Sequence, residues 1–175
     1  MKLKIKIKSP YDIKITNKGD WFDLKYTGED ITFDGFENVK TNYIDAEGKK
    51  HYKKRVTPRV ELLNLGVAMQ LPKGFEAIVA PRSSTPKHYN ILCANSIGII
   101  DNSYNGDGDI WMFPAFIYGS KSIKYGDRIC QFRIQLSQKA TVLQKLKWLF
   151  TSGIEFIYVD KLENENRGGI GSTGK

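Results

Sequence analysis

The sequence predicts an all-β fold of the jelly-roll, sandwich or barrel type with one short helix. Apolar and polar residues alternate along most of the chain, which is the period of half-buried strands. The alternating runs are short, and Gly, Pro, Asn or Asp interrupts them, as in segments 71–74 and 125–127. Many short strands separated by such turns are typical of sandwiches, jelly rolls and barrels.

The first strand is expected at residues 2–8, where Leu3, Ile5 and Ile7 point inward and four lysines point outward. Lysines along a strand discourage pairing with another chain, so we expect this strand at the edge of a sheet. Further runs with strand periodicity follow at residues 11–15, 21–26, 60–71, 75–80, 91–100, 110–118, 127–136 and 154–160.

Two segments depart from the strand pattern. Residues 34–57 are polar, rich in lysine and without periodicity, which predicts a long loop or a hairpin that leaves the sheet. Residues 141–150 place Leu143, Leu146 and Phe150 at helical spacing, which predicts the one short helix, amphipathic and on the surface.

Length and composition indicate one globular domain. A chain of 175 residues, 41% hydrophobic and 26% charged, is ordinary for such a domain. No stretch approaches the ~18 apolar residues of a membrane span, and the alternating N-terminus is not a signal peptide. Cys93 and Cys130 lack metal-type spacing, so we expect buried free thiols and a cytoplasmic protein.

The net charge of +8 admits nucleic acid, an anionic membrane or a small polyanion as a partner. The lysines are scattered, with local clusters at 49–55 and 139–147, and we find no RNA-binding aromatic motif and no helix-turn-helix pattern. A solvated basic surface is the preferred interpretation, and we expect neither a nucleic-acid nor a membrane partner.

The C-terminus is the most informative segment. It offers two cations, two hydroxyls and many bare backbone N–H groups that could cradle a polyphosphate, in the order Arg167, Gly168, Gly169, Ile170, Gly171, Ser172, Thr173, Gly174 and Lys175. We expect residues 1–162 to form the domain and residues 163–175 a flexible arm that closes over the ligand. A functionless terminus or cloning scar is the alternative; the dinucleotide-binding fingerprint is excluded because no helix can follow.

An apolar strand that ends at Asp101 predicts a second functional segment. The chain turns through Asn102 and Ser103 and presents Tyr104 before Asn105-Gly106, a dipeptide that signals a hairpin. An acid at a strand end can reach a pocket while the sheet fixes its position. The same segment imitates a calcium-binding loop, but Met112 replaces the required glutamate, so we do not expect calcium.

Two weaker motifs point to phosphate. Arg82-Ser83-Ser84, between prolines, suits phosphate oxygens held by side chains and backbone N–H groups, although a serine-rich turn is the alternative. The Asp-Arg pair in 126–131 opens a strand and by itself indicates a structural role.

Taken in order, these segments resemble the five motifs of the homotrimeric dUTPases, and the chain looks closest to the branch found in bacilli and their phages. The matching segments are 19–24, 82–84, 98–106, 126–131 and 167–174, and residues 65–77 also fit the family. The resemblance leaves out 34–57 and about 141–152, which look like insertions. It implies a distorted jelly-roll subunit, a homotrimer with sites between subunits, and Mg2+-assisted hydrolysis of dUTP. The products would be dUMP and pyrophosphate. This reaction would keep uracil out of DNA and would supply dUMP for thymidylate synthesis.

The resemblance also implies roles for single residues. Asp101 would activate the attacking water, Tyr104 would pack on the deoxyribose, and Asp23 would contact the metal through water. The uracil would be recognised by the backbone of Asn95 and of the 98–101 hairpin, including Gly98 and Ile100. The phosphates would be held by Arg82, Ser83, Ser84, Gln131, Arg167, Gly168, Gly169, Ile170, Gly171, Ser172 and Thr173.

Two departures from the family pattern qualify these expectations. Ile170 replaces the aromatic that commonly follows the two glycines, so either an aliphatic side chain suffices as a lid or Trp111 or Phe113 takes its place. Trp21 stands where the family usually has Gly. The rival functions are dCTP deamination on the same fold and a regulatory, protein-binding role through 34–57 or 141–152.

Overall fold

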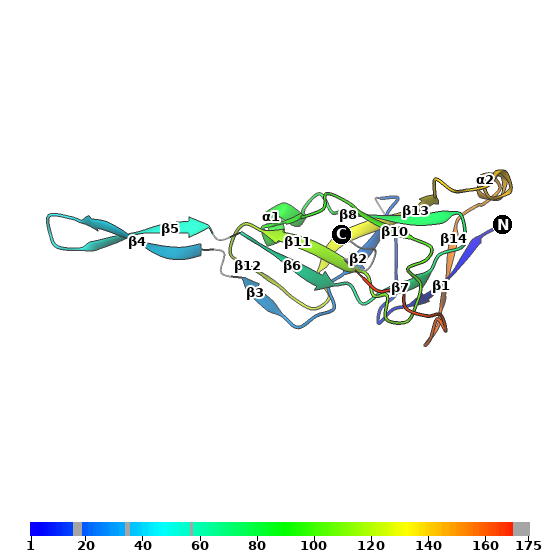
Figure 1. Ribbon diagram of the computed structural model, residues 1–175, viewed down its shortest axis with the longest axis horizontal. Coiled ribbons are helices and arrows are strands. Elements are labelled where there is room, and N and C mark those ends of the chain that lie inside the picture. The colour runs from blue at the N-terminus through cyan, green and yellow to red at the C-terminus, as the bar shows by residue number, and fades with distance from the viewer. Residues whose placement is uncertain (16–18, 34–35, 57, 170–175) are drawn as a thin grey trace.

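The computed structural model describes residues 1–15, 19–33, 36–56 and 58–169, and in these ranges strands make up most of the regular secondary structure (Figure 1). Two helices, α1 (Thr85–Tyr89) and α2 (Val142–Leu149), complete the described fold. The all-β prediction is therefore confirmed. The sequence analysis missed α1, a single turn that begins beside Pro86 and ends at Asn90 in the left-handed conformation (φ 53°).

Three sheets form the body of the protein. The first has the order β14 (Ile154–Tyr158), β1 (Leu3–Lys8), β7 (Ala68–Gln70). The second has the order β10 (Gly98–Asp101), β8 (Phe75–Pro81), β13 (Arg128–Leu136), β2 (Phe22–Lys25). The third has the order β6 (Arg59–Asn64), β11 (Met112–Ile117), β9 (Ile91–Cys93). Two pairs remain, β3 (Ile31–Phe33) with β12 (Lys121–Ile123) and β4 (Phe36–Ile44) with β5 (Lys50–Val56).

One apolar core lies between these sheets. Its aromatic centre is Phe132 on β13, whose ring lies 5.2 Å from Trp111 and 5.1 Å from Phe22. Phe156 of β14 meets Phe22 edge-on at 5.0 Å and so joins the first sheet to the second. Side chains of a strand alternate between its two faces. Where one face of a strand packs its rings into the core, the intervening side chains therefore point away from the core.

The first strand forms as expected, but its predicted place at a sheet edge is wrong. Leu3, Ile5 and Ile7 are buried, as the alternation predicts. Nevertheless, β1 pairs in parallel with β14 along its length and antiparallel with β7 at its end. Two strands from distant parts of the chain supply these partners, which the local lysine pattern cannot reveal.

Several predicted strand boundaries also need correction. Residues 11–15 contain only an isolated bridge from Ile15 to Phe22. The run 60–71 is broken at Gly66 (φ 67°) and the run 91–100 at Ser96 (φ 65°), so each forms two strands. The three-residue strands β3 and β12 were missed because they are too short to show a period.

The polar segment 34–57 contains a hairpin, one of the two predicted alternatives. Strands β4 and β5 pair with each other and, among the described strands, with no other. In Figure 1 this hairpin extends away from the body of the protein.

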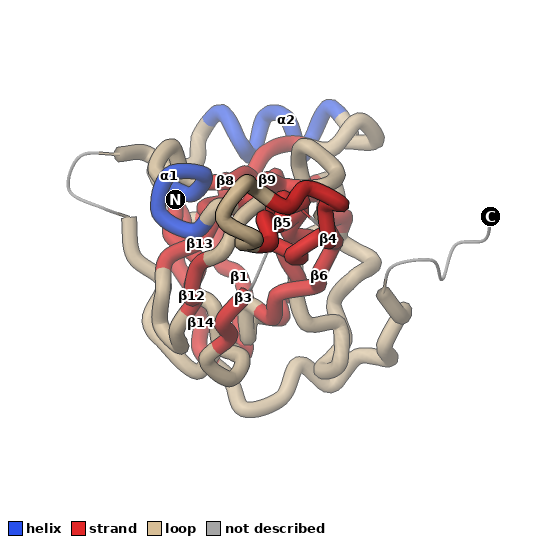
Figure 2. The backbone as a smooth tube through the Cα atoms, turned by 90° about the vertical axis from the view of Figure 1, so that its left-hand side faces the viewer, coloured by secondary structure: helices blue, strands red, loops and turns tan. Residues whose placement is uncertain are grey.

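Helix α2 confirms the helix predicted at 141–150. Thr141 caps it: its hydroxyl accepts the Gln144 N–H, and the Gln144 side chain accepts the Thr141 N–H in return. Figure 2 shows α2 lying across one side of the strands. Only Trp148 reaches the core, against Phe75, whereas Val142, Leu143, Leu146, Leu149 and Phe150 are exposed. In the described part of the chain, neither helix is long and apolar enough to cross a membrane.

Candidate active site

A pocket of about 450 Å³ lies where the end of β10, the start of β11 and the C-terminal segment meet. Eight residues predicted from the sequence line it together: Asn95, Gly98, Ile100, Asp101, Tyr104, Arg167, Gly168 and Gly169. These residues come from two segments more than 60 positions apart, and the fold brings them to one place.

Asp101 is the last residue of β10, and its carboxylate is held from two sides. Ser103 donates its backbone N–H (2.9 Å) and its hydroxyl to Oδ1. Arg167 donates from Nη1 to Oδ2 at 2.7 Å. The Asp101 side chain remains 46% exposed, so water can reach it.

These contacts determine the protonation state of Asp101. Its partial burial opposes ionisation, but the Ser103 donors and the Arg167 guanidinium outweigh that effect and hold the pKa of Asp101 below its usual value. Asp101 is therefore a carboxylate at neutral pH and can accept a proton.

Tyr104 forms one wall of the pocket. Its hydroxyl donates to the Ile110 carbonyl (3.0 Å), which fixes the ring, and burial raises the pKa of Tyr104. A Cβ atom on Gly169 would lie 3.6 Å from the Tyr104 hydroxyl, so the C-terminal segment passes close to this ring.

The strand β10 that carries Gly98 and Ile100 does not form the predicted hairpin at Asn105-Gly106. It pairs with β8 and is an edge strand of the second sheet, while the next strand, β11, belongs to the third sheet. Within the described sheet, one side of the β10 backbone is consequently open toward the pocket.

Asp109 is a functional candidate that the sequence analysis missed. Its side chain is buried and accepts hydrogen bonds from the backbone N–H groups of Arg167 (3.0 Å) and Gly168 (3.1 Å). Burial opposes its ionisation, but these bonds and others from Gly106 and Asn105 keep the pKa of Asp109 below its usual value. The only sequence signal for Asp109 was that an acidic residue lies near Asp101. The same residue also matches a position of the calcium-binding loop that was rejected above.

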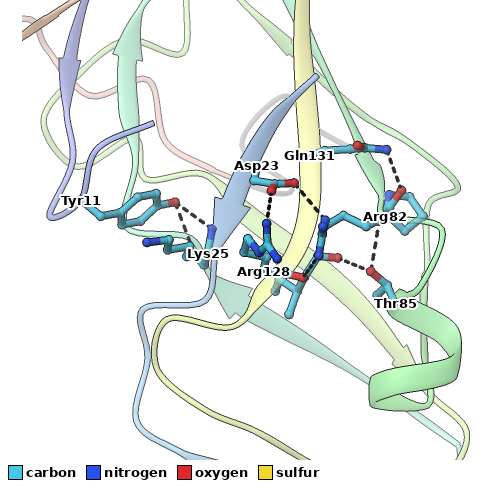
Figure 3. Close-up of polar contacts among 9 residues, drawn as sticks. Tyr11, Asp23, Lys25, Arg82, Thr85, Arg128 and Gln131 are labelled. Atoms are coloured by element: carbon cyan, nitrogen blue, oxygen red, sulfur yellow. Dashed lines mark hydrogen bonds and ion pairs between the residues drawn. The ribbon is translucent and has the colours of Figure 1, made fainter. Parts of the chain in front are cut away.

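The remaining described candidates lie in a second cluster, on β2, β8 and β13 (Figure 3). Arg82 Nε lies 2.9 Å from one oxygen of Asp23, and Arg128 Nη1 lies 3.0 Å from the other. Gln131 donates from Nε2 to the Pro81 carbonyl at 3.4 Å. Arg128 was expected to be structural, yet it is 48% exposed and shares Asp23 with Arg82, so the cluster holds two arginines for one carboxylate.

Ser83 and Ser84 follow Arg82 in the turn that leads into α1. Ser83 is exposed, and Ser84 caps the helix without a side-chain bond. Thr85 secures the turn because its hydroxyl donates to the Ile129 carbonyl (2.7 Å) and accepts the Arg82 N–H. The turn therefore keeps Arg82, Ser83 and Ser84 next to one another in the chain.

Asp23, which was predicted to contact a metal through water, is paired with two arginines in the free chain. Its carboxylate is only 10% exposed, and both of its oxygens are engaged by guanidinium groups. Among the described residues, no three His, Cys, Asp or Glu side chains lie close enough to hold a metal ion.

The aromatic side chains of Trp111 and Phe113, which were considered as lids, do not lie over the pocket. Trp111 and Phe113 are completely buried in the core, although Trp111 contributes to the pocket wall. Neither can cover the pocket in this state. The predicted residues Ile170, Gly171, Ser172 and Thr173 lie outside the described residues.

Comparison with known proteins gives one family. A family model described as dUTPase matches residues 52–147, more than half of the chain. The SPbeta prophage-derived deoxyuridine 5'-triphosphate nucleotidohydrolase YosS of Bacillus subtilis (strain 168) is 40% identical over 176 residues, which cover 99% of each chain. The deoxyuridine 5'-triphosphate nucleotidohydrolase of Finegoldia magna is 32% identical over 117 residues, 65% of this chain and 70% of that protein.

Solved structures agree at the level of the fold. The dUTPase from Streptococcus mutans has a TM-score of 0.54 at 17% identity and covers 79% of this chain and 98% of its own. The dUTPase from phage phi11 of S. aureus has a TM-score of 0.54 at 12% identity, covering 79% and 93%.

Proposed function

This chain belongs to the dUTPase family and is a dUTP diphosphatase, and we propose that Asp101 is the base that activates the attacking water. The observation that carries this assignment is the ionised, partly exposed Asp101 carboxylate in one pocket with Tyr104 and Arg167. A strand end fixes the carboxylate, and its lowered pKa keeps it available as a proton acceptor at neutral pH.

Cleavage of the phosphoanhydride needs little covalent chemistry, so positioning and charge neutralisation supply most of the rate. Asp101 removes a proton from water as the water oxygen bonds to the α-phosphorus. The bond from that phosphorus to the bridging oxygen breaks, and pyrophosphate leaves with the electron pair. Arg167 pairs with Asp101 in the free chain, so we propose that the more highly charged triphosphate draws the guanidinium away and frees the carboxylate.

Substrate selection follows from the same pocket. The open side of β10 offers backbone N–H and C=O groups to the edge of a flat base, beside Asn95. If cytosine bound in place of uracil, these backbone groups would be buried under the base without hydrogen-bond partners. The binding free energy lost in this way is larger per contact than the loss caused by a steric clash with the thymine methyl group. Tyr104 packs on the deoxyribose and leaves no room for a 2′-hydroxyl.

The available side chains fit a Mg2+ ion bound mainly by phosphate oxygens and water. Mg2+ favours such ligands over an all-protein cage, and no three-residue cage exists among the described side chains. Arg82, Ser83, Ser84, Gln131 and Arg167 would bind the triphosphate that carries the ion. When bound, Mg2+ neutralises phosphate charge and helps to orient the α-phosphate.

We also propose the homotrimer that the family implies. The phosphate-binding candidates Arg82, Ser83, Ser84 and Gln131 do not line the pocket of Asp101 in their own chain. In addition, Val60, Leu62, Leu92 and Met112 expose apolar side chains on one face of the third sheet, and Leu62 and Met112 border the pocket. A second copy that covers this face would complete the site at a subunit boundary.

Leu92→Asp is expected to dissociate the assembly, because it would put an unpaired charge into a buried interface. Leu92 is 45% exposed in the single chain and does not line the pocket. Light scattering should give the mass of one chain for this variant and of three for the wild type. The matched control is Leu149→Asp on α2, which should stay trimeric; an unchanged mass for Leu92→Asp would contradict the proposed interface.

Pyrophosphate release from dUTP, dCTP, dTTP and UTP tests the activity itself. We expect a preference for dUTP of at least ~10²-fold over each of the others, and slower turnover after Mg2+ removal. Ammonia release from dCTP would instead identify the deaminase.

The thiols of Cys93 and Cys130 are both free, which supports the proposed cytoplasmic location, although Cys93 is only half-buried.

A further inference from the structure

We propose that Thr85 is a positioning residue for the triphosphate, because its hydroxyl sets the turn 82–84 at a fixed distance from strand β13. The proposal rests on the function assigned above, in which this turn and Gln131 bind the phosphates. Thr85 needs no contact with the substrate for this purpose, since it acts through the main chain of Arg82.

The Thr85 hydroxyl is buried and bonded on both sides. Among the described residues, the buried polar side chains are those of Asp23, Thr85 and Asp109, and Thr85 is 0% exposed. Its hydroxyl donates to the Ile129 carbonyl at 2.7 Å and accepts the Arg82 N–H at 3.2 Å, and both bonds can be followed in Figure 3. A buried hydroxyl costs free energy unless it is bonded in this way. It therefore links main-chain groups of two segments that lie more than 40 positions apart.

This link stands where the ladder between β8 and β13 ends. The last pair of that ladder is Pro81 with Cys130. One residue further in the same antiparallel register, Arg82 would face Ile129, and their main chains could bond directly. The chain turns into α1 instead, and the Thr85 hydroxyl lies between the Arg82 N–H and the Ile129 carbonyl. The hydroxyl thus acts as a spacer that opens the turn and leaves neither main-chain group unpaired.

A side chain in this place must donate to one main-chain group and accept from another. A Ser or Thr hydroxyl does both with one atom, whereas Val has the shape of Thr but neither capacity. With Val, a buried N–H and a buried C=O would lose their partner. The Thr85 N–H would still donate to the Arg82 carbonyl (3.0 Å), so the turn itself would persist without its fixed distance from β13.

The link to Ile129 orients the turn toward the other phosphate-binding candidates. Ile129 lies on β13 between Arg128 and Gln131. The Arg82 guanidinium reaches the same strand, because Nη1 donates to the Arg128 carbonyl at 3.5 Å, while Nε lies 2.9 Å from Asp23. Both the main chain and the side chain of Arg82 are therefore held in the free chain. Groups that are fixed before binding lose less freedom when the triphosphate arrives.

The test compares the full-length wild type with Thr85→Val and Thr85→Ser. Calorimetry gives the affinities for dUMP and for a non-hydrolysable dUTP analogue, which differ in their number of phosphates. We expect Thr85→Val to weaken binding of the analogue by ~10–100-fold and of dUMP by less than ~3-fold. Thr85→Ser keeps the hydroxyl and should bind both ligands as the wild type does.

A second readout does not depend on the substrate. Hydrogen exchange at the Arg82 amide, resolved by mass spectrometry with fragmentation, should be ~10-fold faster in Thr85→Val because this amide loses its acceptor. The matched control is Thr27→Val. The Thr27 hydroxyl also donates to a main-chain carbonyl of another strand, that of Asn64 at 3.2 Å, but Thr27 lies outside the pocket. This control should match the wild type in Arg82 exchange and in both affinities.

Three outcomes would overturn the proposal. Equal weakening of dUMP and the analogue would indicate a general loss of structure, wild-type exchange in Thr85→Val would mean that the hydroxyl does not hold the turn, and failure of Thr85→Ser would mean that the hydroxyl is not the decisive group. If Thr85→Val does not fold, Thr85→Ala decides. Water can then reach both main-chain groups but does not fix their separation, so the same selective loss is expected, and unchanged affinities would contradict the proposal.

Arg82→Ala separates this proposal from the proposed function. If that variant binds the dUTP analogue as tightly as the wild type, the turn does not bind phosphate and its proposed function is wrong. Exchange at the Arg82 amide in Thr85→Val would still decide whether the hydroxyl holds the turn against β13.

Discussion

Replacing Asp101 with Asn is expected to abolish dUTP turnover while leaving dUTP binding largely intact. Asn has the same shape but cannot accept the proton of the attacking water, and general-base assistance contributes ~10²–10⁴ in rate. The lost carboxylate also releases Arg167, which pairs with it in the free chain, for the phosphates. Steady-state kinetics gives the turnover, and calorimetry with a non-hydrolysable dUTP analogue gives the affinity.

The pH profile supplies an independent check on Asp101. Its folded pKa is lowered, so the base is fully ionised at neutral pH and activity is lost only as the pH falls through that lowered value. Removing the guanidinium with Arg167→Ala should move the acid limb of kcat/KM toward higher pH. An Asp101→Asn protein that loses binding as severely as turnover would argue against the role of base.

Shortening the chain to residues 1–166 is expected to leave a folded assembly with turnover reduced by ~10³-fold or more. An arginine that neutralises charge on a transferring phosphoryl group is worth about that much. The fold should survive because residues 167–169, the last that the structure describes, contribute nothing to the apolar core. Circular dichroism, light scattering and dUTP kinetics measure the three quantities.

Full-length Arg167→Ala is the matched control for this truncation. It removes the guanidinium but keeps the rest of the arm, so a smaller loss than in the shortened chain would assign part of the effect to the arm backbone. Unchanged turnover in the shortened chain would refute the role of the arm altogether.

Much of the site could be predicted from local sequence. Asp101 stands at the end of an apolar strand, Tyr104 stands in the turn that follows, and Arg167 begins a glycine-rich terminus. Each signal lies within a few consecutive residues, which is the range over which periodicity and turn chemistry act. Their order along the chain then indicated the family, which the comparisons confirm.

Contacts between distant segments could not be predicted in the same way. The pairing of Asp23 with Arg82 and Arg128 was not predicted, because the two arginines come from distant parts of the chain. Gly106 was attributed to a hairpin, although the atoms that require glycine belong to Asn166. In both cases the decisive partner is about 50 positions or more away.

The sequence by itself determined the strand-rich fold class, the apolar face of β1 and the residues proposed to carry the chemistry, because side-chain alternation and turn residues act locally. Only the tertiary structure decided that β1 lies between two strands, that Arg82 and Gln131 lie apart from the pocket of Asp101, and that Asp109 accepts the backbone N–H of Arg167. These features depend on which distant backbone groups find each other when the core forms, and a short stretch of sequence carries no record of its partner.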